Sequence, residues 1–450
     1  MTKLLDVTQD AAWFARTLTR GLATNSDPVR NRRWQDAQVA SVVGYAARHV
    51  PYYRQLFRDH GIEAGSIRSV DDLQRIPVTT KAMLKQLPLS DRVSEAYRPG
   101  DLVRHTTSGS SGIPFEILRT WFDERRMNVF WIRHIMRQGV QPRHRSVVLT
   151  GVRTVPSGDR LFVQRTLAHV GLFRTERVNC LRPAEEILRD VVLRKPDHLM
   201  GYAWALLRVG EAYVASGRKG FQPRAIHPFG EVVTPSMRER LIQAFQCPVL
   251  DIYGSYEFGM AAFECRETAG YHVSDDAVVL EVLRNGVPVG EGESGILTGT
   301  NLSGYAMPFI RFEIGDIATR GSNPCRCGWR SSTISQLRGR MLDMFPLPGG
   351  REIHPYRIVF IIIQYLADRV FQYQLIQESI DRIVLYLVPT PGTTIPGFDD
   401  LTSAVEELLG SDVRFEIQIV EEIDFEQSGK FRVSRSRVTS EYDQPEIAQA

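Results

Sequence analysis

The chain has 450 residues and a mass of 51.0 kDa, more than one hydrophobic core usually holds, so we expect at least two folded units. Hydrophobic residues make up 43% and charged residues 24% of the chain, which is ordinary for a globular protein and excludes the fibrous and largely disordered classes. The formal net charge is only +3, and the arginines are interleaved with acidic residues. We therefore expect no basic face for a nucleic acid.

The cysteine count and the apolar runs indicate a reducing compartment. Five cysteines are too few for a disulfide scaffold in a chain of this length, and an odd number cannot all be paired. The N-terminus carries Asp6 and Asp10 and lacks the apolar stretch of a secretion signal. The longest apolar run, 358–367, is about half of the ~20 residues that span a bilayer. We predict a cytoplasmic protein with no membrane partner.

The first 300 residues predict helices followed by an alternation of strands and helices. Apolar residues recur at helical spacing from Val39 to Val50, and Pro51 breaks the pattern. Thr80 is expected to cap a further helix. The alternation after residue 100 is typical of α/β layers. It consists of expected strands at 115–118, 146–150, 225–229 and 249–253, expected helices at 184–193 and 235–245, and later strands at 278–283 and 295–300.

A second, smaller unit is expected after a segment rich in Gly and Pro at 338–350 (RGRMLDMFPLPGG), which we interpret as a linker. Strand-like runs follow at 371–377, 382–388 and 414–420, with helical segments at about 355–366 and 399–409. This pattern predicts an α+β unit of about 110 residues. We place the domains at 1–338, with a helical opening to about residue 100, and at 339–450.

A loop rich in Ser, Thr and Gly covers Thr106–Pro114. Its hydroxyls and unobstructed backbone N–H groups are what phosphate oxygens need. It lacks the G-x-x-x-x-G-K-[ST] pattern, and composition alone favours a flexible surface loop. Both interpretations stay open from this segment alone.

Three further short motifs can carry chemistry. In DIYGSYEFG, a strand is expected to end at Tyr253 and turn at Gly254, so that the ring could stack on a base and Glu257 could hold a divalent cation. In IRFEIGD, Asp316 follows a turn and could accept hydrogen bonds from ribose hydroxyls. Lys430 follows Gly429 and could present a charge to an anion. Each has a simpler interpretation: a tyrosine at a core edge with a solvated glutamate, an ordinary turn, and a solvated lysine.

The order and spacing of these motifs are more specific than any one of them. The Ser/Thr/Gly loop, Tyr-Gly-x-x-Glu, Arg-x-x-x-Gly-Asp, a Gly-Arg near 340 and a Gly-Lys near 430 together resemble the adenylate-forming superfamily. Within it, the chain resembles the phenylacetate–CoA ligase branch, including relatives described as capsule-biosynthesis proteins. AARHVPYYRQLFRDHGI and DDLQRIPVTTK are similar to the opening of that branch. The resemblance covers nearly the whole chain, from roughly residue 35 to residue 437.

The resemblance implies an α/β fold with a large multi-layer N-terminal adenylation domain and a small mobile α+β C-terminal lid domain. It implies that ATP, with Mg²⁺, converts a carboxylic acid to an acyl-adenylate, and that CoA then displaces AMP. The default substrate is an aromatic or arylacetic acid. The partners are these small molecules, and relatives are often dimers, which makes a homodimer an open possibility.

The resemblance also assigns roles to residues. The phosphate loop is formed by Thr107, Ser108, Gly109, Ser110, Ser111 and Gly112. Tyr253 with Gly254 contacts adenine, Glu257 binds Mg²⁺, Gly230 and Glu231 line the nucleotide pocket, and Asp316 holds the ribose. Arg340 approaches ribose or phosphate, and Lys430 bridges the acyl carboxylate and the α-phosphate.

Two positions depart from the family pattern. Ile113 stands where the phosphate loop usually has a lysine, and Leu342 replaces one of two adjacent acids at the expected hinge. Two alternatives therefore stay open beside the CoA ligase. One is adenylation with transfer to an amine or a carrier-protein thiol, and the other is a nucleotide-binding relative without turnover.

Cys265, His272, Cys325 and Cys327 could together bind a metal, because three thiolates and one imidazole satisfy tetrahedral Zn²⁺. Spacing alone leaves open whether they hold a metal or are buried free thiols. Some members of the resembled branch carry a similar cluster, which implies structural Zn²⁺. Cys180 and Cys247 are expected in the core.

The acyl pocket is expected between the Ser/Thr/Gly loop and the Tyr253 strand. Its candidate lining is Trp131, Tyr202, Trp204 and Phe229, although the helical pattern around the two tryptophans favours core packing for either of them. His227, at an expected strand end, either orients the substrate or is a structural histidine.

Overall fold

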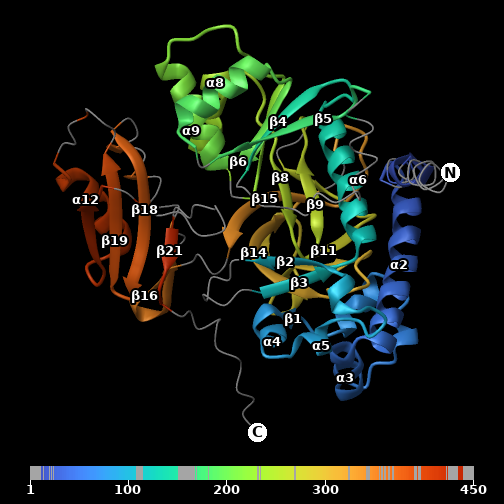
Figure 1. Ribbon diagram of the computed structural model, residues 1–450. Coiled ribbons are helices and arrows are strands. Elements are labelled where there is room, and N and C mark those ends of the chain that lie inside the picture. Colours follow the sequence, from blue (N-terminus) through green and yellow to red (C-terminus); the bar gives the residue numbers. More distant parts are fainter. Residues whose placement is uncertain are drawn as a thin grey trace. The chain divides into compact units, whose positions relative to one another are not determined.

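The computed structural model describes residues 12–13, 15–19, 21, 23, 25–107, 115–150, 168, 170–180, 182–230, 233, 235–267, 270–322, 325–340, 345–353, 355, 358, 361–362, 365–366, 369–389, 393, 397–421, 423 and 434–438 (Figure 1). The chain divides into two compact units, Met1–Arg338 and Gly339–Ala450. Within the described residues, no helix combines the length and the apolar character that crossing a lipid bilayer requires.

The first unit opens with two helices that meet at Pro51, as predicted. The carboxylate of Asp27 caps α2 (Pro28–His49) by accepting hydrogen bonds from two backbone N–H groups of the first turn. Val50 is extended, and Pro51 begins α3 (Pro51–Asp59), because proline suits the first position of a helix but not its interior. Short elements follow: η1 (Ala64–Ser66), η2 (Asp71–Arg75), β1 (Thr79–Thr80), α4 (Lys81–Lys85), α5 (Leu89–Arg92) and η3 (Pro99–Asp101).

One half of the large sheet is parallel and has helical crossovers. Its strands, in the order β5-β4-β6-β7-β8, are β4 (Arg145–Thr150), β5 (Arg174–Asn179), β6 (His198–Tyr202), β7 (Ala225–Phe229) and β8 (Ile252–Ser255). The crossovers are α8 (Ala184–Arg194), α9 (Ala203–Ala215) and α10 (Pro235–Phe245). The sequence pattern predicted this alternation, and the carboxyl ends of such strands form the edge at which α/β folds usually bind ligands.

The other half of the large sheet is mainly antiparallel and continues from β8. Its order is β12-β11-β13-β14-β15-β10-β9, and β1 adds to β14 in parallel. The strands are β9 (Gly259–Glu264), β10 (Tyr271–Val273), β11 (Val278–Arg284), β12 (Val287–Pro288), β13 (Ser294–Asn301), β14 (Phe312–Arg320) and β15 (Thr333–Arg340). Helix α6 (Trp121–Arg137) packs against β9. Strands β2 (Val103–Thr107) and β3 (Phe115–Arg119) form a two-stranded sheet of their own among the described residues.

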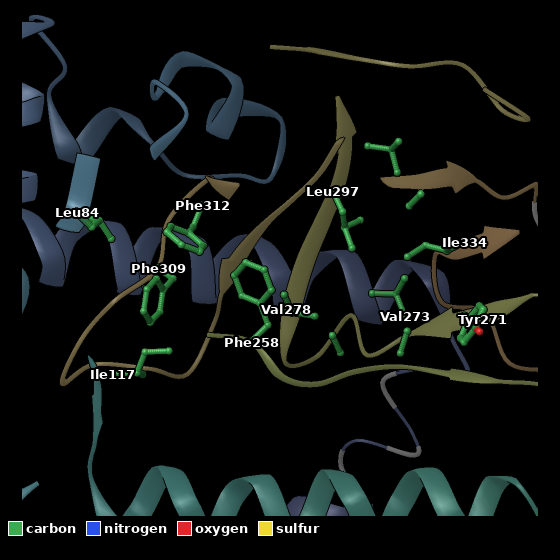
Figure 2. Packing of buried hydrophobic residues seen from close by; sticks show 14 of the residues in the cluster. Leu84, Ile117, Phe258, Tyr271, Val273, Val278, Leu297, Phe309, Phe312 and Ile334 are labelled. Atoms are coloured by element: carbon green, nitrogen blue, oxygen red, sulfur yellow. The ribbon is translucent and has the colours of Figure 1, made fainter. Parts of the chain in front are cut away.

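Buried side chains of the antiparallel half form one core (Figure 2). The rings of Phe309 and Phe312 meet edge to face with centroids 5.0 Å apart, and Phe258 meets Phe312 in the same way at 6.3 Å. Gly299 makes room for this packing, because a Cβ there would lie 2.5 Å from the ring of Phe258. Burying a ring of this size stabilises the fold by about 1.5–3 kcal/mol, so this core fixes β13 and β14, and β14 carries Asp316 of the candidate site.

The second unit is a small α+β fold. Its sheet has the order β20-β19-β18-β21, with β18 (Val370–Ser379), β19 (Arg382–Pro389), β20 (Arg414–Ile419) and β21 (Ser434–Ser436). The three longer strands and helix α12 (Asp399–Leu409) confirm the sequence prediction. The expected linker is partly wrong, because β15 extends to Arg340 and a small β16 (Phe345–Leu347) pairs with β17 (Arg351–Ile353) beside η6 (Pro348–Gly350).

Candidate functional site

The described residues include part of the predicted nucleotide site. Tyr253, Gly254, Glu257, Asp316 and Gly230 are described in full, and Thr107 and Arg340 are described as backbone at the ends of β2 and β15. Several predicted positions lie outside the described residues: Ser108, Gly109, Ser110, Ser111, Gly112, Ile113, Glu231, Leu342 and Lys430.

Tyr253 and Asp316 lie together although 63 residues separate them in the sequence. The hydroxyl of Tyr253 on β8 donates a hydrogen bond of 2.5 Å to Oδ2 of Asp316 on β14. The two strands are distant in the sheet order, so this contact brings together two motifs that the sequence could only place in order.

The strand geometry around Tyr253 differs from the prediction. Strand β8 does not end at Tyr253 with a turn at Gly254, because it continues to Ser255 and pairs with β9 in antiparallel orientation. The register shifts between Tyr253 and Gly254, which marks a bulge. A Cβ at Gly254 would lie 2.6 Å from the carbonyl oxygen of Gly259, so glycine permits this close approach of the two strands.

Asp316 also differs from the prediction. We expected it after a turn, but it lies inside strand β14. Gly315 has a φ of 83° within β14, and the register to β13 shifts between Ile296 and Thr298. A glycine in this left-handed region allows a strand to bulge and continue. The bulge positions Asp316 toward Tyr253 without ending the sheet.

Glu257 lies in the tight connection between β8 and β9. Glu257 is only 5% exposed, so the interpretation as a solvated glutamate is wrong. Its carbonyl oxygen accepts a hydrogen bond of 2.8 Å from Nδ2 of Asn301, and Ser255 Oγ accepts one of 3.1 Å from the Phe258 N–H. This connection is therefore held in one conformation by its neighbours.

Aromatic side chains gather where β6 and β7 end. Phe229 meets Trp131 with ring centroids 5.9 Å apart and Tyr202 at 5.7 Å. Gly230 follows with a φ of 78°, and a Cβ there would lie 3.3 Å from the Tyr202 ring. Trp204 is different, because it is 6% exposed and its ring lies beside the Arg208 guanidinium, which fits the interpretation as core.

His227 is a buried structural histidine, not a residue that faces a ligand. It is fully buried on β7. Its Nε2 is hydrogen-bonded to Nδ1 of His198 at 3.0 Å, and its Nδ1 to Oε1 of Gln138 at 2.8 Å. Two further polar side chains, His105 and Arg119, contact Tyr256 in the Tyr253–Glu257 segment, and Glu124 is hydrogen-bonded to both of them. No motif predicts these three residues, since they meet only through the pairing of β2 with β3 and the position of the first turn of α6.

The four predicted metal ligands form one cluster. Cys265 follows β9, His272 is on β10, and Cys325 and Cys327 lie in the turn before β15. Their ligand atoms all lie within 4.8 Å of one another. Sγ of Cys265 is 3.9 Å from Sγ of Cys325, and Sγ of Cys327 is 3.3 Å from Nε2 of His272. Cys180 and Cys247 are buried elsewhere, as expected.

This geometry fits a tetrahedral cation. Tetrahedral Zn²⁺ spaces two thiolate sulfurs by about 3.8 Å and a sulfur and an imidazole nitrogen by about 3.5 Å. Burial, with Arg137 nearby, lowers the pKa of His272 to about 4, so the imidazole is neutral and can act as a ligand. Burial raises the pKa of Cys265 to about 12, so a nearby cation is needed to keep it as a thiolate. Ser331 Oγ lies 3.4 Å from Nδ1 of His272 and can orient the ring.

Comparison with known proteins identifies relatives that cover most of the chain. Residues 348–436 match the family model described as the CapK C-terminal domain. The phenylacetate-coenzyme A ligase of Thermus thermophilus is 23% identical over 373 residues, which are 77% of this chain and 78% of that protein. The Escherichia coli enzyme of that name is 26% identical over 351 residues (72% and 76%), and the Staphylococcus aureus protein CapK is 21% identical over 419 residues (90% and 89%).

Solved structures share the fold. A 2-hydroxyisobutyryl-CoA ligase in the postadenylation state, in complex with an acyl-AMP, has a TM-score of 0.73 at 20% identity and covers 89% of this chain and 88% of its own. The anthranilate CoA ligase AuaEII in complex with anthranoyl-AMP has a TM-score of 0.54 at 16% identity, with 76% and 66% covered. These likenesses confirm the predicted α/β fold class with a large N-terminal and a small C-terminal part.

Proposed function

We propose that this chain, a homologue of the phenylacetate–CoA ligases and of CapK within the adenylate-forming superfamily, activates a carboxylic acid with ATP and transfers the acyl group to coenzyme A. The observation that carries the proposal is the hydrogen bond between Tyr253 and Asp316, since it joins two of the ordered nucleotide motifs in space. The relatives and the acyl-AMP complexes of structures with this fold support the same reaction.

The proposed reaction has two steps. In the first, the substrate carboxylate attacks the α-phosphorus of ATP, and pyrophosphate leaves. In the second, the thiol of CoA loses its proton, attacks the acyl carbon and displaces AMP. Because an anionic acid must approach a polyanion, the first step needs positive charge and N–H donors around the phosphates. We assign these roles to the loop at 107–112, to Arg340 and to Lys430.

The nucleotide itself is held, in this proposal, by the residues on β8 and β14. Tyr253 stacks on adenine, with Gly254 beside it, and Gly230 and Glu231 line the pocket. A carboxylate can accept several hydrogen bonds, so Asp316 can bind ribose hydroxyls while it accepts from Tyr253. Mg²⁺ in nucleotide sites is commonly bound through one or two carboxylates and the substrate phosphates, and the buried carboxylate of Glu257 suits that role.

An aromatic or arylacetic acid is the proposed substrate. The cluster of Trp131, Tyr202 and Phe229 lies at the carboxyl ends of β6 and β7, the edge where α/β sheets bind ligands. Aromatic rings in edge-to-face contact accommodate a further ring well.

The test is ATP–pyrophosphate exchange with a panel of aromatic, arylacetic and short aliphatic acids. We expect exchange with at least one ring-containing acid, and a thioester on addition of CoA, identified by mass spectrometry beside amine and carrier-protein acceptors. Lys430→Ala should lower the exchange rate by about 100- to 1000-fold, since one charge placed at a transition state has effects of this size. Lys219→Ala, at an exposed lysine, is the matched control and should exchange normally. Background exchange with every acid by folded protein would overturn the proposal.

We also propose that Cys265, His272, Cys325 and Cys327 bind a structural Zn²⁺. All four positions of a tetrahedral ion are then filled by the protein, which leaves no open position for substrate. The proposal rests on the spacing of the ligand atoms and on their chemistry.

A further inference from the structure

Three polar side chains at the base of the β2–β3 hairpin form one hydrogen-bonded network. His105 is on β2, Arg119 ends β3, and Glu124 is in the first turn of α6. Oε1 of Glu124 lies 2.6 Å from Nε2 of His105 and 3.2 Å from Nη1 of Arg119. Their side chains are only 14%, 12% and 20% exposed. The network is therefore largely withdrawn from water, where such bonds are stronger than at the surface.

Tyr256 is the residue that this network contacts. Its ring stacks on the imidazole of His105, with centroids 4.9 Å apart and an angle of 27° between the planes. The Arg119 guanidinium lies 5.8 Å from the centre of the same ring, and its Nη2 donates a hydrogen bond to the Tyr256 carbonyl oxygen. Both the side chain and the backbone of Tyr256 are thus held from the hairpin.

Glu124 stays ionised in this network. Burial alone would raise the pKa of its carboxyl, but the hydrogen bond from His105 and the charge of Arg119 outweigh burial and lower the pKa. A carboxylate accepts from both neighbours at once and fixes their orientation, which a neutral group would do less strongly.

The hairpin also packs into the core of the antiparallel half, through the buried side chains of Phe115 and Ile117. In the part of the chain that the structure describes, β2 and β3 pair only with each other, and an isolated two-stranded hairpin is marginal in water. Tyr256 directly precedes Glu257 and lies in the connection from β8 to β9. The contacts of His105 and Arg119 with Tyr256 therefore add a polar link between the hairpin and the Tyr253–Glu257 segment to this apolar packing.

We propose that His105, Arg119 and Glu124 are positioning residues for nucleotide binding. They hold Tyr256, and through the backbone Glu257, at a fixed place relative to the hairpin that leads into residues 108–114. The inference rests on the proposed function only in taking the Tyr253–Glu257 segment as part of a nucleotide site. None of the three residues needs to touch the substrate.

The decisive measurement is the dissociation constant for ATP with Mg²⁺, determined by titration calorimetry, because it does not require turnover. Glu124→Gln keeps the shape of the side chain but removes its charge, and His105→Ala removes the stacked ring. We expect each to weaken ATP binding by about tenfold, in line with the loss of one charge-assisted bond or one ring contact. His105→Phe keeps a flat ring on Tyr256 and should regain part of the affinity that His105→Ala loses.

Arg104→Ala is the matched control, because Arg104 pairs with Glu116 on the same hairpin at an exposed position and does not contact Tyr256. It should bind ATP as the wild type does. Where exchange can be measured, the KM for ATP should rise in Glu124→Gln while the KM for the acid stays near wild type. Unchanged ATP affinity in Glu124→Gln and His105→Ala, or a fall in melting temperature alone, would overturn the inference. Absence of exchange in wild-type protein that still binds ATP would instead count against the proposed function only.

Discussion

Two buried clusters that contain histidine lie in different halves of the large sheet, and they solve the problem of burying polar atoms differently. In the parallel half, His144, His198 and His227 form a chain in which Nδ1 of one ring lies 3.0 Å from Nε2 of the next. The chain ends at Gln138, whose amide donates to the carbonyl oxygens at positions 251 and 264. The antiparallel half holds the Cys265–His272–Cys325–Cys327 cluster.

The difference lies in what each cluster needs from outside the protein. Neutral imidazoles can donate through one nitrogen and accept through the other, so His198 and His227 have a partner at each ring nitrogen within the fold, whereas Nε2 of His144 at the end of the chain has none among the described residues. Thiols are weak donors and acceptors, and three of them with one imidazole gain little from one another. A divalent cation converts the same four groups into strong ligands. Residue chemistry, and not burial, is therefore the reason why we expect a metal at the cysteine cluster and not at the histidine chain.

Removal of the metal should give the largest effect, and only at the cysteine cluster. Cys325→Ser, or prolonged treatment with a chelator, should reduce zinc from about one ion per chain and destabilise the first unit by about 4 kcal/mol or more, as loss of a structural metal usually does. Metal analysis and chemical unfolding measure the two outcomes. Cys247→Ala alters a buried cysteine elsewhere and should keep its zinc. Well under one zinc per chain in freshly purified wild-type protein would reject the metal site.

The cysteine cluster could be predicted from the sequence because its signal lies in the residue types. Cys, His, Cys and Cys form a plausible ligand set wherever the backbone brings them together, and the structure had only to provide the contact. The helix at Pro235–Phe245 and the strand at Ala225–Phe229 could be predicted for a similar reason, since local apolar periodicity and a leading proline mark them.

The histidine chain and the His105 network could not be predicted, because they depend on register. His198 and His227 come from neighbouring parallel strands, and His144 comes just before a third, so nothing local joins them. The bulges at Gly254 and Gly315 could not be predicted either. Each permits a bulge inside a strand, whereas the sequence suggested turns that end the strands, because a Gly-containing motif at a bulge looks like one at a turn.

Acidification should produce the second largest effect, and it should act through the histidine chain. Burial lowers the pKa of His198 to about 4, whereas an exposed histidine titrates near 6.5. Above pH 6.5 the ring is neutral in both states and contributes no pH dependence. Below pH 6.5 His198 is protonated in the unfolded chain but stays neutral in the folded protein. The free energy of unfolding therefore falls as the pH drops toward about 4. At pH 5 the titration of His198 has lowered the free energy of unfolding by about 2 kcal/mol relative to neutral pH.

A variant separates this contribution from others. Burial raises the pKa of Asp251 and Asp275 to about 7, and because the unfolded chain releases these protons at lower pH, they reduce stability as the pH rises from about 4 to 7. In the wild type, the two aspartates therefore make the fold more stable on acidification, whereas His198 makes it less stable. His198→Gln keeps both aspartates, so between pH 7 and pH 5 its unfolding free energy should fall by about 2 kcal/mol less than that of the wild type. Equal changes in the two proteins would show that His198 does not titrate in this way.

The smallest effect is expected at the edge of the cysteine cluster. Ser331 is fully buried and lies close enough to Nδ1 of His272 to hold the ring with Nε2 toward the sulfurs. Ser331→Ala should weaken zinc retention about tenfold in competition with a chromogenic chelator, because groups that orient a metal ligand typically contribute 10- to 100-fold to affinity. With zinc in excess, the unfolding free energy should stay within about 1 kcal/mol of the wild type. Ser303→Ala, a serine remote from the cluster, should retain zinc normally. Equal zinc affinity in Ser331→Ala and the wild type would mean that the four ligands orient His272 by themselves, and that the contrast with the histidine chain lies entirely in the thiols.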